Sequence, residues 1–320
     1  MNTLLYIVVP CYNEAAVLRE TANRLQAKLH RLMAAGTITT DSKLLFVNDG
    51  SDDATWSIIT ELHHQSPLFA GLNLSKNQGH QSALLAGLML AKTYAQVVIS
   101  MDADLQDDIN AVDAMLEQYR QGHDIVYGVR SKRIRDTWFK RSSARSFYKL
   151  MHLLGVNMIV DSADYRLMSK RALDGLEQFT EVNLFLRGVV PMVGYPSAIV
   201  YYERGERFAG ETKYPLRKMI TFALEGITSL SIRPIRMITV MGLVFFLLSL
   251  GVLVYSIVDY LMDGTVPGWA SLLVSVWSIG SLQLMGIGII GEYIGKIYLE
   301  TKQRPRYLIE SVLLKTDTSV

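Results

Sequence analysis

The sequence predicts an α/β domain with a mostly parallel sheet, followed by an amphipathic interface helix and two transmembrane helices. Short β-favouring runs alternate with segments of helical period up to about residue 130, a basic amphipathic segment comes later, and two long stretches near the C-terminus carry no charge. We expect four regions: a main domain (1–210), a juxtamembrane helix (211–234), two spans joined by a short loop (235–292) and a cytoplasmic tail (293–320).

The composition excludes several classes of protein. With 32 basic and 30 acidic residues the chain has no global attraction to nucleic acid, and we expect no nucleic-acid partner. Cys11 is the only cysteine, so an intrachain disulfide and a CxxC metal or redox motif are excluded. The mean hydropathy of +0.20 is high for a soluble protein and indicates that part of the chain lies in lipid.

The main domain is predicted from its alternating pattern. Helical segments such as 16–33 and 82–92 separate the β-rich runs, which is typical of a mostly parallel sheet with helices on both faces. In such sheets ligands bind beyond the carboxyl ends of the strands. The expected strands are 5–9, 44–47, 72–74, 97–100 and 125–127.

Three of these strands end in polar clusters, "VVPCYNE", "LFVNDGSDD" and "VVISMDADLQDD", and we expect all three in one crevice. In the third, Asp102 and Asp104 can share a hard divalent cation, Mg²⁺ or Mn²⁺, with Gln106 as a neutral oxygen ligand. Such an ion keeps positions open for phosphate oxygens. We interpret Asp107 and Asp108 as the charged start of the next helix. A capped turn is the alternative for the "DAD" stretch alone.

The first two clusters carry groups that suit a nucleoside. Asp49 ends the second strand, and its carboxylate could accept a hydrogen bond from a base or a ribose. Taken alone, the stretch "VNDGSDD" indicates only a turn followed by a helix cap. Pro10 stops the first strand, Tyr12 suits a flat base and Glu14 is an acceptor. Together with the acidic cluster, these residues fit a nucleotide diphosphate bridged by a metal.

The C-terminal part is predicted to cross a membrane twice. Residues 237–258 and 264–291 carry no charge, and a helix of about 20 residues crosses a hydrocarbon core of about 30 Å. Two buried helices of a soluble core are the alternative, but the rest of the chain supplies no shell for them. Basic residues flank the pair while the loop between them has only acidic ones, so both termini are expected in the cytoplasm, at the inner (plasma) membrane.

The juxtamembrane segment "GETKYPLRKMITFALEGITSLSI" has apolar residues at helical spacing and basic residues at its start. It is typical of a helix lying in an anionic lipid interface, and a surface helix packed on the domain is the alternative. Further on, "GIGIIG" matches a dinucleotide-binding pattern but follows no strand, so we reject that function. Gly291 and Gly295, at GxxxG spacing, favour close helix packing within the chain or between protomers.

Seven motifs occur in order: "VVPCYNE", "VNDGSDD", "LSKNQGHQSAL", "DADLQD", "YGVRSKR", "DSADYRLMSK" and "RFAGETKYPLRKM". Followed by the two uncharged stretches and "GEYIGKIYLETKQRPRY", they resemble the inverting, Rossmann-like GT-A glycosyltransferases of family 2 that load a sugar onto a polyprenyl phosphate. The resemblance is strongest to bacterial bactoprenol (undecaprenyl-phosphate) glucosyltransferases, with dolichyl-phosphate mannose synthases as more distant relatives. It covers nearly the whole chain.

The resemblance implies roles on the donor side of the reaction. In such enzymes the nucleoside, the metal and the sugar are held by separate groups. The nucleoside residues would be Pro10, Tyr12, Glu14 and Asp49, with Asp102 against the ribose and diphosphate; the metal residues would be Asp104 and Gln106, joined by Asp102; and the residues around the sugar would be Asp161, Asp164 and Arg166.

On the acceptor side the resemblance implies cations against a lipid phosphate. These would be Arg130, which we also count as catalytic, Arg141, Arg145, Arg207 and Lys213. Arg141 and Arg145 equally fit a solvated helix face. A phosphate acceptor is already an anionic nucleophile, so no general base is required and catalysis would rest on in-line positioning and on charge neutralisation by the metal.

The resemblance thus implies a metal-dependent enzyme that moves glucose from UDP-glucose to undecaprenyl phosphate, with membrane lipid and further copies of the chain as partners. Transfer of another sugar (GlcNAc, mannose, galactose or aminoarabinose) is an alternative. A processive polysaccharide synthase would need a QxxRW motif and more spans, which the sequence lacks. A non-catalytic membrane scaffold conflicts with the intact "DADLQ" motif.

Overall fold

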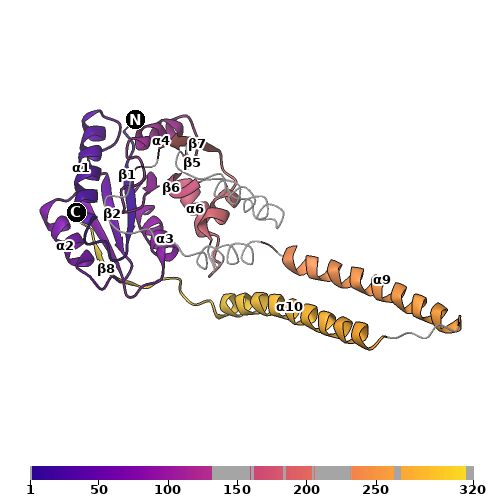
Figure 1. Cartoon of the computed structure of the whole chain (residues 1–320). Helices are drawn as coiled ribbons and strands as arrows, with labels where there is room; N and C mark the ends of the chain where they lie inside the picture. Colours follow the sequence, from indigo (N-terminus) through magenta and orange to yellow (C-terminus); the bar gives the residue numbers. More distant parts are fainter. Residues whose placement is uncertain are drawn as a thin grey trace.

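The computed structural model describes residues 2–131, 159, 162–182, 185–203, 205, 231, 233–262 and 268–314. Its elements alternate between strand and helix up to the fifth strand, as the sequence pattern predicts (Figure 1). In chain order they are β1 (Leu5–Cys11), α1 (Leu18–Ala34), β2 (Lys43–Asn48), α2 (Thr55–Gln65), β3 (Phe69–Leu74), α3 (His80–Ala91), β4 (Val97–Ser100), α4 (Ala111–Arg120), β5 (Ile125–Arg130), β6 (Ser162–Ser169), α6 (Lys170–Glu177), α7 (Leu186–Met192), β7 (Ser197–Tyr202), α9 (Arg233–Leu261), α10 (Trp269–Lys302) and β8 (Ile309–Leu313).

The strands form one sheet in the order β7-β5-β6-β4-β1-β2-β3-β8. β1 pairs in parallel with β2 and β4, β2 with β3, and β5 with β7. β6 runs antiparallel to β4 and β5, and β8 runs antiparallel to β3. The expected α/β domain with a mostly parallel sheet is confirmed, and all five predicted strands are present as β1 to β5.

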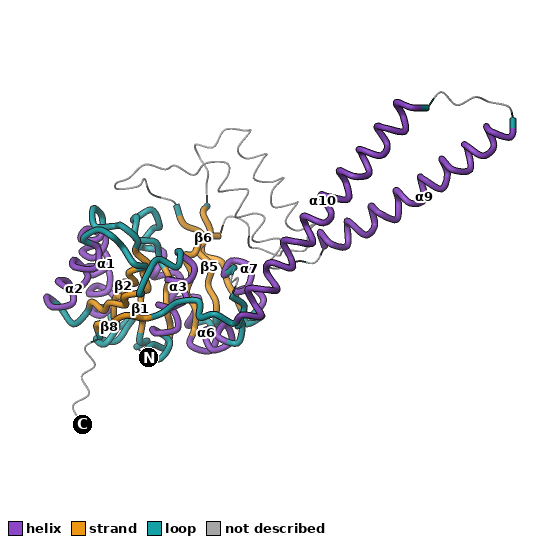
Figure 2. Tube along the Cα trace, turned by 90° about the horizontal axis from the view of Figure 1, so that it is seen from below, coloured by secondary structure: helices purple, strands orange, loops and turns teal. Residues whose placement is uncertain are grey.

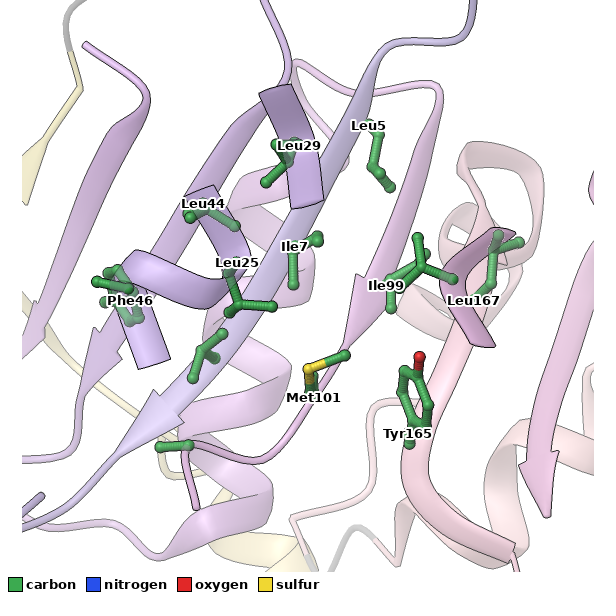
Figure 3. Close-up of a cluster of buried hydrophobic side chains, with 14 of the residues drawn as sticks. Leu5, Ile7, Leu25, Leu29, Leu44, Phe46, Ile99, Met101, Tyr165 and Leu167 are labelled. Atoms are coloured by element: carbon green, nitrogen blue, oxygen red, sulfur yellow. The ribbon is translucent and has the colours of Figure 1, made fainter. Parts of the chain in front are cut away.

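Successive residues of the central strand β1 point to opposite faces of the sheet. Ile7 packs with Leu25 and Leu29 of α1 in the cluster of Figure 3, which α2 and α4 complete. Val8 packs with α3, α6 and α7 on the other face. There a side chain at Gly87 would lie 2.5 Å from Val8, so glycine lets α3 approach the sheet closely. Each fully buried aliphatic side chain contributes about 1.5–3 kcal/mol, and the two cores hold the strand ends in place.

Helices α9 and α10 run side by side away from the sheet (Figures 1 and 2). Many of their apolar side chains are exposed. Among the helices that the structure describes, none is long and apolar enough to cross a membrane, so the predicted pair of spans is not supported. Most of the predicted juxtamembrane helix, 211–230, lies outside the described residues.

After α10 the chain returns to the sheet. Residues 293–320 are predicted as a tail, but α10 continues to Lys302 and β8 then pairs with the edge of β3. Gln303 ends α10 in the left-handed conformation, with a φ of 46°, which turns the chain back toward the sheet. The last described part of the chain therefore contributes to the main domain.

Candidate functional site

The parallel pairing of β1, β2 and β4 brings the three predicted polar clusters to one edge of the sheet. Cys11 and Asn48, the last residues of β1 and β2, lie opposite each other, and β4 ends at Ser100, opposite Val8 of β1, so the loop after β4 begins beside the last residues of β1. Parallel strands expose their carboxyl ends together, and this is the edge at which α/β sheets bind ligands. The clusters 10–14, 48–53 and 101–108 therefore border a common site.

Asp49 lies at the end of β2 and is buried, with 2% of its surface exposed. Its Oδ1 accepts a hydrogen bond from the backbone N–H of Gln78 at 2.7 Å. Gly50 follows with a φ of +60°, and a Cβ there would lie 2.4 Å from the backbone nitrogen of Asn77, so the turn requires glycine. Burial raises the pKa of the Asp49 carboxyl above its ordinary value.

The cluster after β1 is joined to this turn by hydrogen bonds. The N–H of Asn13 donates to Ser51 Oγ at 3.0 Å, and the N–H of Glu14 donates to Thr55 Oγ1 at 3.0 Å. Tyr12 is 45% exposed, so one face of its ring is free to contact a ligand. Pro10 lies within β1 rather than after it, and it is buried. The structure thus brings together all four residues predicted to hold a nucleoside.

The acidic loop after β4 is fixed by its backbone. The carbonyl of Ala103 accepts a hydrogen bond from Thr21 Oγ1 at 2.7 Å, and Asp104 Oδ1 accepts one from the N–H of Gln106 at 3.1 Å. Leu105 has a φ of 59°, which is costly for a residue with a branched side chain. That strained turn lets Asp104 and Gln106 fold back toward each other, and Gln106 is buried.

The oxygen atoms of this loop suit a hard divalent cation. No group of three or more His, Cys, Asp or Glu side chains in the described ranges is arranged to hold a metal ion. Two carboxylates and one amide, from Asp102, Asp104 and Gln106, still provide the all-oxygen donor set that Mg²⁺ and Mn²⁺ prefer. Burial and the charges of Asp164 and Asp104 raise the pKa of Asp102. A cation here would offset that repulsion.

Asp164, on β6, is the centre of a charged cluster beside the acidic loop. It is 4% exposed, and its Oδ1 accepts a hydrogen bond from Arg166 at 2.6 Å. Arg187 donates to both of its oxygens, at 3.3 and 3.0 Å. Burial would raise the pKa of Asp164, but His80 and the two arginines outweigh it and hold this pKa well below its ordinary range. The carboxylate is therefore ionised at neutral pH.

His80 connects this cluster to the acidic loop. Its Nε2 lies 3.7 Å from Asp102 Oδ1 and 3.5 Å from Asp164 Oδ2. Burial would lower the pKa of His80, but the two carboxylates outweigh burial and raise it. The sequence predicts no role for His80 or for Arg187. No local signal could have found either residue, because their partners lie 84 and 23 positions away along the chain.

The structure corrects the prediction that Asp107 belongs to the start of the next helix. Helix α4 begins at Ala111, and Asp107 is instead buried, with 4% of its surface exposed. Tyr202 of β7 donates to its Oδ1 at 2.5 Å, and Arg130 lies 3.9 Å away. Burial and the charge of Asp102 raise its pKa to about 6. Arg130, predicted as a catalytic and phosphate-binding residue, is thus placed beside the acidic loop.

Five predicted site residues lie outside the described residues, and their roles stay predictions. They are Asp161, Arg141, Arg145, Arg207 and Lys213. Of the residues predicted around the sugar, Asp164 and Arg166 lie next to each other. The structure therefore joins the predicted nucleoside, metal and sugar groups along one sheet edge, and leaves most of the predicted lipid-phosphate group undescribed.

The chain is similar in sequence to known glycosyltransferases. The model of the glycosyl transferase family 2 matches residues 6–176. An uncharacterized glycosyltransferase, YkoT, of Bacillus subtilis (strain 168) is 52% identical over 307 residues, covering 96% of this chain and 91% of that protein. The bactoprenol glucosyl transferase of Shigella phage SfX is 42% identical over 271 residues, covering 84% and 88%.

Among solved structures, the glucosyl-3-phosphoglycerate synthase of Mycobacterium tuberculosis, in complex with Mn²⁺, UDP and phosphoglyceric acid, is similar to part of this chain. It is 17% identical, has a TM-score of 0.44, and the match covers 71% of this chain and 77% of that one.

Proposed function

The chain belongs to glycosyl transferase family 2, and we propose that it moves glucose from UDP-glucose onto undecaprenyl phosphate with inversion. The observation that carries the proposal is the convergence of a nucleoside-type cluster, an all-oxygen metal-type cluster and a buried, ionised Asp164 at one sheet edge. The name of the relative from Shigella phage SfX, a bactoprenol glucosyl transferase, supports the choice of sugar and of lipid.

The nucleoside end of the donor would lie against the clusters after β1 and β2. The exposed ring of Tyr12 offers a flat surface for the base. Asp49 and Glu14 offer acceptor oxygens for base or ribose groups, and Pro10, buried near the end of β1, precedes Tyr12 by two residues. The donor is held here by shape and hydrogen bonds, because the Asp49 turn is fixed from both sides.

The diphosphate of the donor would lie over the acidic loop. Asp102, Asp104 and Gln106 would hold Mg²⁺ or Mn²⁺, and such an ion, when bound, neutralises charge on a departing diphosphate. At the strained Leu105 turn, the hydrogen bond from the Gln106 N–H keeps the Asp104 carboxylate oriented before any ligand arrives. Without the ion the two negative carboxylates would repel the phosphates.

The sugar would lie toward Asp164. Its ionised carboxylate, with both oxygens already hydrogen-bonded to arginines, acts as an orienting acceptor for a sugar hydroxyl rather than as a base. Arg187 has a third of its side chain exposed and can reach a phosphate of the donor. The lipid phosphate attacks as the nucleophile, and Arg130, Arg141, Arg145, Arg207 and Lys213 are the cations proposed to meet it.

We place the reaction at the cytoplasmic face of the inner (plasma) membrane, with both termini in the cytoplasm and several copies of the chain as an assembly. Exposed apolar side chains along α9 and α10, such as Leu247 at 58%, Val254 at 57% and Ile287 at 64%, support contact between this helix pair and membrane lipid. A lipid-borne acceptor would then reach the sheet edge from the side of the helices (Figure 2).

The decisive experiment offers the purified full chain a panel of UDP- and GDP-sugars with Mg²⁺ or Mn²⁺ and undecaprenyl phosphate, and identifies the lipid product by mass spectrometry. We expect a β-linked glucosyl lipid from UDP-glucose alone. A product carrying another sugar would correct the donor, and the absence of any glycolipid would refute the function.

Replacing the metal-type carboxylate sharpens the test. Asp104→Ala should lower transfer at least about 100-fold, because the metal ion that neutralises the diphosphate would lose a carboxylate ligand. The thermal midpoint should change little, since the Asp104 side chain is only partly buried. Asp108→Ala, two residues beyond Gln106, is the matched control and should retain transfer. Full activity in Asp104→Ala would remove the metal assignment.

A further inference from the structure

The edge strand β8 contains one residue more than its partner. Asn73 of β3 lies opposite Ser311, and Leu74 lies opposite Ile309, so Glu310 between them has no partner on β3. An extra residue of this kind is a β-bulge, and bulges often re-aim a side chain next to a functional site. Here the Glu310 carboxylate accepts a hydrogen bond from Asn73 Nδ2 at 2.7 Å.

This bond begins a chain of hydrogen bonds that leads toward the nucleoside cluster. Asn48 Nδ2 donates to Asn73 Oδ1 at 2.7 Å, and Asn48 Oδ1 accepts from the N–H of Ser51 at 3.4 Å. Asn48 and Asn73 are 2% and 8% exposed. Ser51 closes the turn that begins at Asp49. The chain of hydrogen bonds therefore runs from Glu310 at the sheet edge to the turn of Asp49, which is proposed to hold the nucleoside.

Glu310, at the outer end, sets the donor-to-acceptor direction of these hydrogen bonds. A carboxylate can only accept, so Asn73 must direct its amide nitrogen toward Glu310 and its oxygen toward Asn48. Asn48 must then direct its own nitrogen toward Asn73, which leaves its oxygen for the N–H of Ser51. Reversing the first amide would reverse the second and bring two donors face to face at Ser51.

A second connection from β8 reaches the same turn. The N–H of Ser75, just beyond β3, donates to the carbonyl of Leu308 at 3.0 Å. The segment that continues from Ser75 passes close to Gly50 and supplies the Gln78 N–H that binds the Asp49 carboxylate. The strand that follows α10 therefore supports the Asp49 turn by both a side-chain and a backbone connection.

We propose that Glu310 is a positioning residue for the nucleotide: by fixing the amide orientation of Asn73 and Asn48, it holds the Asp49–Ser51 turn in the shape that binds a nucleoside diphosphate. The inference rests on the proposed function for its ligand. It also means that the nucleotide site is complete only when the chain has returned from the α9 and α10 pair to the sheet.

The test compares three full-length variants. Glu310→Lys replaces the acceptor by a donor and should reverse the amide orientations of Asn73 and Asn48. Glu310→Gln keeps one acceptor oxygen in a side chain of the same size and should preserve these orientations. Glu117→Lys, an exposed residue of α4 that accepts only a surface hydrogen bond from Gln121 among its described contacts, makes the same charge change far from the site.

Three measurements are made. In the free protein, amide hydrogen exchange at residues 48–52 should be faster in Glu310→Lys and unchanged in the other two variants. By calorimetry, UDP with Mn²⁺ should bind about tenfold more weakly to Glu310→Lys at unchanged stoichiometry, and within about threefold of the parent in Glu310→Gln. In transfer assays KM for the nucleotide sugar should rise while kcat is kept.

Several outcomes would overturn the proposal. They are exchange and affinity in Glu310→Lys equal to those of the parent, equal weakening in Glu117→Lys, or Glu310→Gln as weak as Glu310→Lys. A fall in stoichiometry and kcat at unchanged Kd and KM would assign Glu310 to folding alone and would likewise overturn it. A parent chain that does not bind UDP would refute the proposed function, while the exchange experiment would still decide whether Glu310 orders the turn.

Discussion

The two halves of the candidate site are held together by different interactions. In the nucleoside half, Asp49 accepts a hydrogen bond from a backbone amide, and the neighbouring turn is supported by two asparagine amides. In the sugar half, Asp164 is surrounded by His80, Arg166 and Arg187. Hydrogen bonds from backbone and side-chain amides hold the nucleoside half, and ion pairs hold the sugar half.

This difference teaches what each half has to achieve. Hydrogen bonds to backbone amides fix a shape and depend little on salt. Ion pairs keep a buried carboxylate charged, which burial alone would not allow, and the pairing pays for that desolvation only while every partner stays in place. We therefore expect the sugar half to react more strongly to substitution and to pH than the nucleoside half.

The largest expected effect is at Asp164. Asp164→Ala leaves Arg166, which is 2% exposed, without its carboxylate, and removing one partner of a buried pair costs about 3–5 kcal/mol. We expect this loss in the free energy of unfolding, measured with urea and tryptophan fluorescence, together with loss of transfer. Ser162→Ala on the same strand is the control. A cost below about 1 kcal/mol would mean that the charged cluster does not hold this half together.

The next effect concerns pH and separates Asp107 and Asp164, whose pKa values are shifted in opposite directions. Asp107 has a pKa of about 6 in the folded chain against an ordinary 3.8, so the folded state binds more protons than the unfolded state between these values. Its contribution therefore falls by about 3 kcal/mol as pH rises through this window. The low pKa of Asp164 has the reverse effect: its contribution is present above pH 3.8 and is lost as pH falls through the folded pKa.

Asp107→Asn tests the first of these slopes. The amide oxygen still accepts from Tyr202, but no charge is buried, so the unfolding free energy should no longer decline from about pH 4 to pH 6. At pH 7 the variant should be more stable than the parent by about 1–3 kcal/mol. Parallel curves of unfolding free energy against pH for variant and parent would contradict the assignment.

Asp107 also marks where prediction from the sequence stops. The strands β1 to β5 and the three clusters at their ends could be predicted, because hydrophobic alternation and turn residues are local signals. Asp107 precedes a helix, so locally it looks like a helix start; its burial depends on Tyr202, which lies 95 positions later. Contacts over that distance leave no periodic pattern in the sequence.

The same limit applies to the sheet edges. β6, β7 and β8 were not predicted, since β6 is antiparallel within a largely parallel sheet and β8 follows two long helices. Likewise the sequence predicts no role for His80, although Asp102 and Asp164 both approach it. The resemblance to a family compensated for this in part, because it assigned Asp164 and Arg166 together.

A smaller effect is expected in the nucleoside half. Asp49→Ala leaves the N–H of Gln78 without its acceptor, which costs about 1–2 kcal/mol, whereas Asp49→Asn keeps an acceptor oxygen and should cost less than about 1 kcal/mol. For both variants KM for the nucleotide sugar should rise more than kcat falls, in steady-state assays. A cost for Asp49→Asn as large as that of Asp164→Ala would remove the distinction between the halves.

The smallest effect on stability should come from Arg187, the outer partner of Asp164. Its side chain is 34% exposed, and Asp164 keeps Arg166 when Arg187 is removed, so Arg187→Ala should cost no more than about 1 kcal/mol after solvent screening. Transfer should nevertheless fall about tenfold, because an arginine fork on the sugar side is lost, and Arg187→Lys should restore only part of it. Urea unfolding and kcat are measured on the same preparations, with Arg171→Ala, an exposed arginine that binds Asp124, as the control. If stability fell by as much as in Asp164→Ala, Arg187 would be a structural partner; if transfer were unchanged, the inner pair alone would orient the sugar.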